Sequence, residues 1–185
     1  MTGVQTCALP IYPKEKDIKE LRSLGFTTAH ITPKGGIFQG NSGLVQLGKT
    51  PKILSGKIAQ IIEYASGSWG SPEYPTSLLG AIAFIRQGFY DADWYGKSIK
   101  ILDKYPDGNE PIQADQSLET LFSEKNNKQP FVFRTSNEIY IDRSKNIADE
   151  FGLNLWLKGN GYEYRRLDEM PASFMIIPLN FPGKP

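Results

Sequence analysis

The chain has 185 residues and a formal net charge of +1, with 39% hydrophobic and 22% charged residues. This length and composition indicate one soluble globular domain with a sizeable core, and a charge so close to zero excludes a broad footprint for nucleic acid. No apolar run reaches the roughly 18 residues that a membrane-spanning helix needs.

The first 11 residues, MTGVQTCALPI, resemble the in-frame translation of a short-read sequencing adapter. In that reading the last adapter base begins codon 12, which must then start with T, and Tyr12 satisfies this condition. We therefore expect residues 1–11 to be a non-native leader and any native signal peptide to be lost, which leaves the compartment unknown. Cys7, the single cysteine, belongs to this leader, so we expect no native disulfide. The alternative is a genuine short N-terminal strand.

Helices and strands are expected to alternate from residue 13 onward. A helix is predicted for residues 13–24, because apolar residues recur at helical spacing and Gly25 follows as a stop signal. Short strands rich in β-branched and apolar residues are predicted for 26–31, 43–48 and 57–62. Loops are predicted where glycine, proline and serine gather, at 33–36 and 66–75.

The second half of the chain has a longer and more regular pattern. It predicts, in order, a helix over 76–95, a turn-rich surface segment over 103–115, a short helix over 116–123, a strand over 130–134, a helix that ends at Gly152, a strand over 153–157, a loop over 158–161, a short helix over 162–169 and a strand over 174–177. Thr135-x-x-Glu138 has the form of a capping box for the helix that ends at Gly152.

Apolar strands that alternate with helices predict an α/β fold with a parallel sheet, because a parallel crossover needs a helix to cover the sheet. Two architectures compete, the doubly wound sheet and the barrel of strands and helices. A doubly wound dinucleotide-binding sheet needs a glycine fingerprint at a strand-to-helix turn. The nearest candidate, Gly159-Asn160-Gly161, has Tyr164 at the third glycine position, so dinucleotide binding is not expected.

Several blocks of sequence follow one another in a fixed order: LGFTTAHITP at 24–33, GGIFQG with LVQLG within 35–48, PTSLLGAIAFIRQ at 75–87 and ADEFG at 148–152. Together they resemble the amidohydrolase superfamily, in its imidazolonepropionase-related branch, over nearly all of residues 12–185. The resemblance implies an incomplete (β/α)8 barrel. A complete barrel has about 250 residues, so we expect residues 12–185 to be a partial barrel domain that is truncated at both ends.

The family hydrolyses C–N bonds with a divalent metal, usually zinc, which histidines and an aspartate hold at the mouth of the barrel. In this chain the fifth-strand motif His-Ala-His-Arg falls on Arg134-Thr135-Ser136-Asn137, and the sixth-strand motif Glu-His-Gly falls on Lys158-Gly159-Asn160. Arginine has no acceptor and glycine has no side chain, so neither replaces a histidine ligand. We therefore expect no metal ligand, no catalytic residue and no cofactor in this chain.

The same replacements make the expected barrel mouth cationic. Arg134 and Lys158 would end neighbouring strands, and the helix start and the glycine turn beside them offer backbone donors to an anion. That anion is either the carboxylate or phosphate of a small ligand, or Glu163 or Glu138 of the chain itself. His30, the only histidine, ends a predicted strand and either contacts a ligand or packs. The expected ligand-binding residues are Arg134, Ser136, Asn137, Lys158, Gly159, Asn160 and His30.

Two functions stay open at this point. In the first, the chain is part of a metal-dependent amidohydrolase and supplies scaffold and pocket to it. In the second, it is a catalytically inactive barrel that binds or assembles with the remainder of the same polypeptide. Arg134 and Lys158 also have a purely structural interpretation, in which they pair with Glu138 or Glu163.

Overall fold

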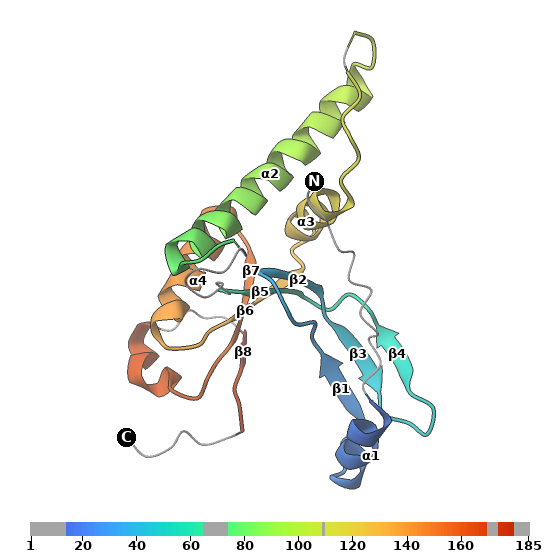
Figure 1. Ribbon diagram of the computed structural model, residues 1–185, viewed down its shortest axis with the longest axis vertical. Helices are drawn as coiled ribbons and strands as arrows, with labels where there is room; N and C mark the ends of the chain where they lie inside the picture. Colours follow the sequence, from blue (N-terminus) through green and yellow to red (C-terminus); the bar gives the residue numbers. More distant parts are fainter. Residues whose placement is uncertain (1–13, 65–73, 109, 170–173, 180–185) are drawn as a thin grey trace.

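The computed structural model describes residues 14–64, 74–108, 110–169 and 174–179, which form two sheets and the helices around them (Figure 1). The α-helices are α1 (Glu15–Ser23), α2 (Leu78–Lys104), α3 (Gln116–Asn126) and α4 (Ile139–Phe151), and a 3₁₀ helix, η1, covers Glu163–Glu169. The expected leader at 1–11 and nearly all of the expected loop at 66–75 lie outside the described residues, so both stay predictions.

The larger sheet has five strands in the order β2-β5-β6-β7-β8. Strands β5 to β8 are parallel, and β2 lies antiparallel to β5 at one edge. The bounds are Phe38–Asn41 for β2, Gln60–Glu63 for β5, Pro130–Arg134 for β6, Asn154–Lys158 for β7 and Phe174–Ile176 for β8. The predicted parallel arrangement is thus confirmed for four strands, but the sheet is open within the described residues and no closed barrel is formed.

The smaller sheet is antiparallel, with the order β1-β3-β4 and the bounds Thr28–Ile31, Gly43–Gln46 and Lys52–Ser55. The sequence predicted β1 and β3 but missed β2 and β4, and it did not predict any antiparallel pairing. Both missed strands have four residues, and β2 is interrupted by a shift in register between Phe38 and Gly40. Because β1 and β3 have the same length and were predicted, the difference lies in composition: β2 contains Gly40 and two amide residues, and β4 has only Ile53 and Leu54 as apolar residues.

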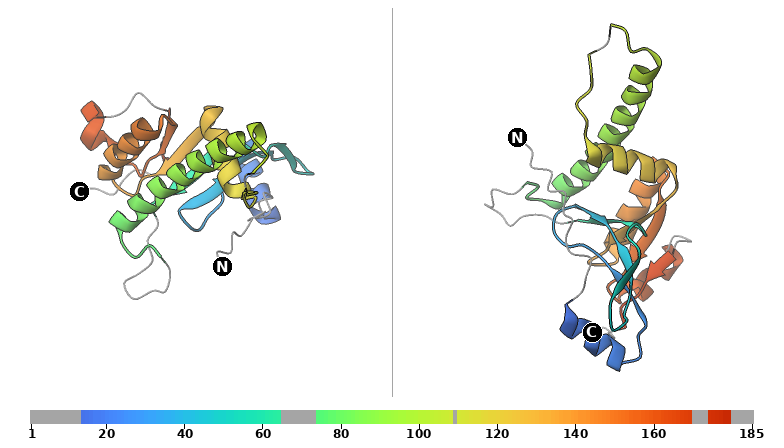
Figure 2. Two further views of the ribbon diagram at one scale, coloured as in Figure 1. Left: turned by 90° about the horizontal axis from the view of Figure 1, so that it is seen from above. Right: turned by 90° about the vertical axis from the view of Figure 1, so that its right-hand side faces the viewer.

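Helix α2 is longer than predicted, with 27 residues in place of the expected segment 76–95. The apolar pattern stops near Tyr95 because the remaining turns are not packed on the sheet. The helix nevertheless continues, since the residues after Tyr95 include lysine and isoleucine and no proline. In Figures 1 and 2 the C-terminal end of α2 projects beyond the body, and the segment after it returns to α3. None of the described helices combines the length and apolar character needed to cross a membrane.

The main core lies between the larger sheet and helices α2 and α4. Phe131 and Phe133 of β6 are register partners of Leu155 and Leu157 of β7 on the covered face, and all four are buried. Against them pack the buried side chains of the two helices, which are Ala81, Ile85, Phe89, Ala92, Ile141, Ile147, Ala148 and Phe151. Burial of these side chains is the main favourable term in folding.

The opposite face of the sheet has a smaller apolar layer, and this layer positions the candidate site. Ile61, Val132 and Trp156 lie side by side there, since they are register partners on β5, β6 and β7. Because side chains alternate between the faces of a strand, the residues two positions later project from the same face. Those residues are Glu63, Arg134 and Lys158.

A buried polar cluster ties α3 to the other end of the sheet. Glu124 is 4% exposed and accepts a hydrogen bond of 2.5 Å from the amide of Asn41, which in turn accepts one of 2.7 Å from Gln129. The second carboxyl oxygen of Glu124, Oε2, is buried without a hydrogen-bond partner among the described residues. Burial raises the pKa of Glu124, and the Asn41 hydrogen bond and the charge of Lys57 oppose this.

This cluster predicts a pH-dependent stability. The folded chain keeps the Glu124 proton to a higher pH than the unfolded chain, so stability falls as the pH rises from the ordinary carboxyl range through the raised pKa. Glu124→Gln removes that loss and should raise the free energy of unfolding by about 1 kcal/mol at pH 8, with little change at pH 4. Urea unfolding at pH 4 and at pH 8 tests this expectation. Glu119→Gln, at an exposed position of the same helix, is the control. An equal gain at both values would contradict it.

Candidate functional site at the strand ends

The carboxyl ends of the parallel strands bring together the polar residues of the site. Glu63, Arg134, Lys158 and Ile176 are register partners across β5, β6, β7 and β8. In open α/β sheets this edge is where ligands bind, because the loops that follow the strands surround it. The structure therefore places Arg134 and Lys158 on neighbouring strands, as the sequence predicted, with one carboxylate beside them.

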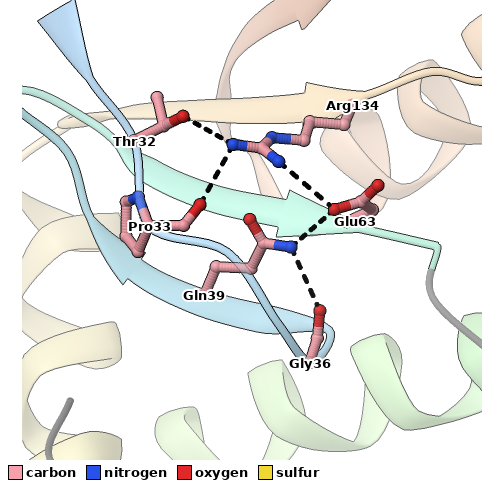
Figure 3. Close-up of polar contacts among 6 residues, drawn as sticks. All are labelled: Thr32, Pro33, Gly36, Gln39, Glu63 and Arg134. Atoms are coloured by element: carbon pink, nitrogen blue, oxygen red, sulfur yellow. Dashed lines mark hydrogen bonds and ion pairs between the residues drawn. The ribbon is translucent and has the colours of Figure 1, made fainter. Parts of the chain in front are cut away.

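Arg134 is held by the segment that follows β1 (Figure 3). Its Nη2 donates to the Thr32 hydroxyl at 2.5 Å and to the Pro33 carbonyl at 3.0 Å, and its Nη1 lies 3.4 Å from Glu63. The Arg134 side chain is 14% exposed. The guanidinium thus connects the segment after β1, and with it the smaller sheet, to the end of β6. Its distance of 3.4 Å to Glu63 is long for a charge-assisted hydrogen bond.

Gln39 of β2 holds the carboxylate from the other side. Its amide nitrogen donates to Glu63 at 2.6 Å and to the Gly36 carbonyl at 3.3 Å. Two atoms of this cluster are buried without a hydrogen-bond partner among the described residues, Oε1 of Gln39 and Nε of Arg134. The cluster is therefore ordered but incompletely satisfied, which is a costly arrangement for buried polar groups.

Positive charge exceeds negative charge at this edge. Burial lowers the pKa of the Lys158 amine, and the charges of Arg134 and Lys34 lower it further, while Glu63 acts in the opposite direction. Two cations and one carboxylate thus act on the Lys158 amine. A further anion near Lys158 would relieve the repulsion among the cations.

The turn after β7 is occupied by a carboxylate of the chain itself. Glu163 is 5% exposed, and its carboxylate accepts from the backbone N–H of Asn160 and, at 2.9 Å, from that of Gly161. A Cβ atom on Gly159 would lie 2.0 Å from the Glu163 carboxylate oxygen, so a side chain there would displace the carboxylate. Of the anions that the sequence left open for this turn, Glu163 is the one observed.

The polar residues after β6 have structural partners. Thr135 does not form the predicted capping box, because its hydroxyl and its N–H both donate to the Lys158 carbonyl at 3.0 Å. The side chain of Asn137 instead accepts from the N–H of Ile139 at the start of α4. Ser136 contributes its carbonyl, which accepts from the Asn160 amide at 2.6 Å.

The sequence had suggested, as a structural role, that Arg134 and Lys158 pair with Glu138 or Glu163, and these partners were wrong. Arg134 lies beside Glu63, whereas Glu138 pairs with Arg165 at 3.6 Å and Glu163 binds the turn. Glu63 and Gln39 were missed, because Glu63 comes one residue after the predicted strand 57–62 and Gln39 falls where no strand was predicted. The sequence did not reveal the register between β5 and β6, which places Glu63 beside Arg134.

His30 belongs to β1 of the smaller sheet, where its side chain is exposed. Partial burial lowers its pKa. The described contacts of the strand-end cluster involve Thr32 and Pro33 of this segment and do not include His30. A ligand role for His30 stays a prediction.

The residues at this edge do not fit a divalent metal ion. The donor set contains a guanidinium, an ammonium group and an amide, with Glu63 as the one carboxylate, and cations repel a metal. Among the described residues, no group of three or more His, Cys, Asp or Glu side chains is placed to hold a metal.

Comparison with known proteins agrees with the fold. No family model and no curated protein sequence matches the chain. Among solved structures, an amidohydrolase from Thermotoga maritima MSB8 superimposes with a TM-score of 0.67 and 19% identity, covering 84% of this chain and 43% of that one. The fold is amidohydrolase-like. The chain spans less than half the length of this amidohydrolase, and at this identity the likeness concerns the fold alone.

Proposed function

We propose that the chain forms part of a (β/α)8 barrel of the amidohydrolase superfamily, in its imidazolonepropionase-related branch, and that its strand ends bind a small anionic ligand in place of a metal. In this proposal Arg134 and Gly159 replace the two histidine ligands of the family, so the barrel binds without catalysing metal-dependent hydrolysis. The observation that carries the proposal is the row of register partners Glu63, Arg134 and Lys158.

The charge balance of this row supports an anion. Within the described residues Lys158 makes no ion pair, and Arg134 has one carboxylate neighbour, at 3.4 Å. The Nε of Arg134 is buried without a partner and Nη2 is taken by Thr32 and Pro33, so a ligand would bind through Nη1, whose one described contact is the long one with Glu63. A ligand carboxylate or phosphate matches the planar fork of arginine and neutralises Lys158 at the same time.

The carboxylate in the glycine turn defines where the ligand binds. Because Glu163 already takes the N–H groups of Asn160 and Gly161, these donors are not open to a ligand in this arrangement. The ligand site is therefore centred on Arg134 and Lys158 and not on the turn. Gly159 and Asn160 act indirectly, by holding Glu163.

Titration calorimetry with acetate and with inorganic phosphate tests the proposal. We expect the wild-type chain to bind at least one of them, and Lys158→Met to weaken that binding by about tenfold, which is about 1.4 kcal/mol. Arg134→Gln should weaken it further and also lower the thermal midpoint, since Arg134 holds Thr32 and Pro33.

Arg22→Gln on the exposed side of α1 is the matched control and should leave binding unchanged. Lys158→Met is informative because none of the described hydrogen bonds or ion pairs depends on the Lys158 amine, so its fold should be intact. If the wild type binds neither anion, and Arg134→Gln changes stability alone, Arg134 is a structural residue and the proposal is wrong.

A further inference from the structure

The amine of Lys158 lies in surroundings that favour a nucleophile over an ion pair. Lys158 is the last residue of β7, an inner strand of the sheet, and its register partners are Arg134 on one side and Ile176 on the other. Trp156 precedes it on the same face and packs on Phe174 with ring centroids 4.4 Å apart. The stem of Lys158 therefore starts from an apolar layer, while the residue itself is exposed and open to a solute.

The charged groups that face this amine are mostly cationic. They are Arg134 of β6, Lys34 of the segment after β1 and Glu63 of β5. Glu63 is already engaged by Gln39 and by Arg134. Two other lysines of the described residues have ion pairs, Lys125 with Asp93 and Lys19 with Glu15.

This environment acts on the proton of the amine. A lysine that sits beside another cation, on partly apolar surroundings, loses its proton more readily, and its neutral form is the nucleophile. The lowered pKa of Lys158 agrees with that geometry. The neighbouring guanidinium at the same time offers a binding group for a carboxylate.

We propose that Lys158 forms an imine with a small oxo acid, a carbonyl compound whose carboxylate is bound by Arg134. Neighbouring strands lie about 4.8 Å apart, and the two side chains project from the same face, so a two- or three-carbon oxo acid is long enough to reach both groups. This assignment rests on the anion site proposed above and names its ligand class.

The step needs no oxidant or reductant. The lone pair of the neutral amine attacks the carbonyl carbon and gives a carbinolamine. The carbonyl oxygen then leaves as water with the two hydrogens of the amine, and a C=N bond remains. The reaction is reversible, and added cyanoborohydride delivers a hydride to the imine carbon, which fixes the adduct as a secondary amine.

Reductive trapping on the full chain tests the inference. The chain is incubated with pyruvate and cyanoborohydride, and modified lysines are located by peptide mass spectrometry. We expect Lys158 to be labelled about tenfold faster than Lys145, an exposed lysine on α4. Acetate should protect Lys158 and not Lys145, Lys158→Arg should remove the fast labelling, and Lys145→Arg should leave it intact.

A neutral aldehyde separates the two proposals. Because the Arg134 charge also acts on the amine, Arg134→Gln should slow both reagents. If it lowers the acetaldehyde and pyruvate rates by the same factor, imine formation stands and the anion site is wrong; if it lowers the pyruvate rate by a larger factor, both stand. If neither reagent labels Lys158 faster than Lys145, the imine inference is overturned, and acetate calorimetry decides the anion site independently.

Discussion

Replacement of Phe89 by alanine is expected to lower the free energy of unfolding by about 3–5 kcal/mol. Phe89 lies in the middle of α2 and is fully buried. Its ring centroid lies 5.8 Å from that of Phe38, 5.6 Å from that of Phe131 and 5.0 Å from that of Phe151. These rings come from β2, β6 and α4, so the substitution opens a cavity where α2 meets three other elements.

The expected loss is a large share of the stability of an ordinary domain, about 5–15 kcal/mol. Urea unfolding followed by circular dichroism measures it. Phe84→Ala is the matched control, because Phe84 lies on the same helix, is 42% exposed and contacts Phe38 from the outer side. We expect it to cost about 1–2 kcal/mol. Equal losses for the two variants would mean that α2 is not anchored through Phe89.

The parallel part of the sheet was predictable from sequence because local signals there agree with one another. The strand predicted for 130–134 is β6, and the strand predicted for 153–157 is β7 displaced by one residue. Gly152 ends α4 as predicted, and its φ of 63° explains why glycine stands there. When a buried apolar strand is followed by a helix that ends at a glycine, few other assignments of secondary structure fit the sequence.

The N-terminal part was less predictable because the pairing of its strands is irregular. The pairing of β2 with β5 shifts in register between Phe38 and Gly40, and that of β3 with β4 shifts between Leu44 and Val45. Their order in the two sheets follows from contacts far apart in sequence, and no local pattern encodes that order. The family resemblance implied an incomplete barrel; within the described residues the sheet is open, and its parallel strands are the part of that expectation which is observed.

The residues of the candidate site also fall into a part that the sequence predicted and a part that it did not. Arg134 and Lys158 were predicted to meet because parallel strands end at one edge, and the structure places them in register. Glu63 and Gln39 were not predicted, since their roles depend on which strand pairs with β6 and on an antiparallel edge strand. Whether these residues bind a ligand stays a proposal, with the calorimetric test given above.

Gly159→Ala is expected to cost about 2–3 kcal/mol of stability, because the added methyl group cannot coexist with the Glu163 carboxylate. The Cβ atom would lie 2.0 Å from Oε1 and 2.5 Å from Cδ of Glu163. The carboxylate must then leave the N–H groups of Asn160 and Gly161, which leaves these half-buried donors without an acceptor. Backbone strain plays no part, since Gly159 is not among the glycines with positive φ.

A double-mutant cycle isolates this contact. Glu163→Ala alone should cost about 1–3 kcal/mol, because it leaves the same donors unpaired. In the Glu163→Ala background the methyl group at position 159 meets no carboxylate, so Gly159→Ala should then cost little. The two variants should therefore be non-additive by about 2 kcal/mol, as expected for residues in direct contact.

Gly56→Ala is the matched control for the cycle. A Cβ atom on Gly56 would meet nothing within 4 Å, so its substitution should leave stability unchanged or slightly improved. Urea unfolding of the four members of the cycle gives the coupling directly. If Gly159→Ala and Glu163→Ala were additive, Glu163 would not occupy the turn in solution, and the N–H groups of Asn160 and Gly161 would be free to bind a ligand anion together with Arg134 and Lys158.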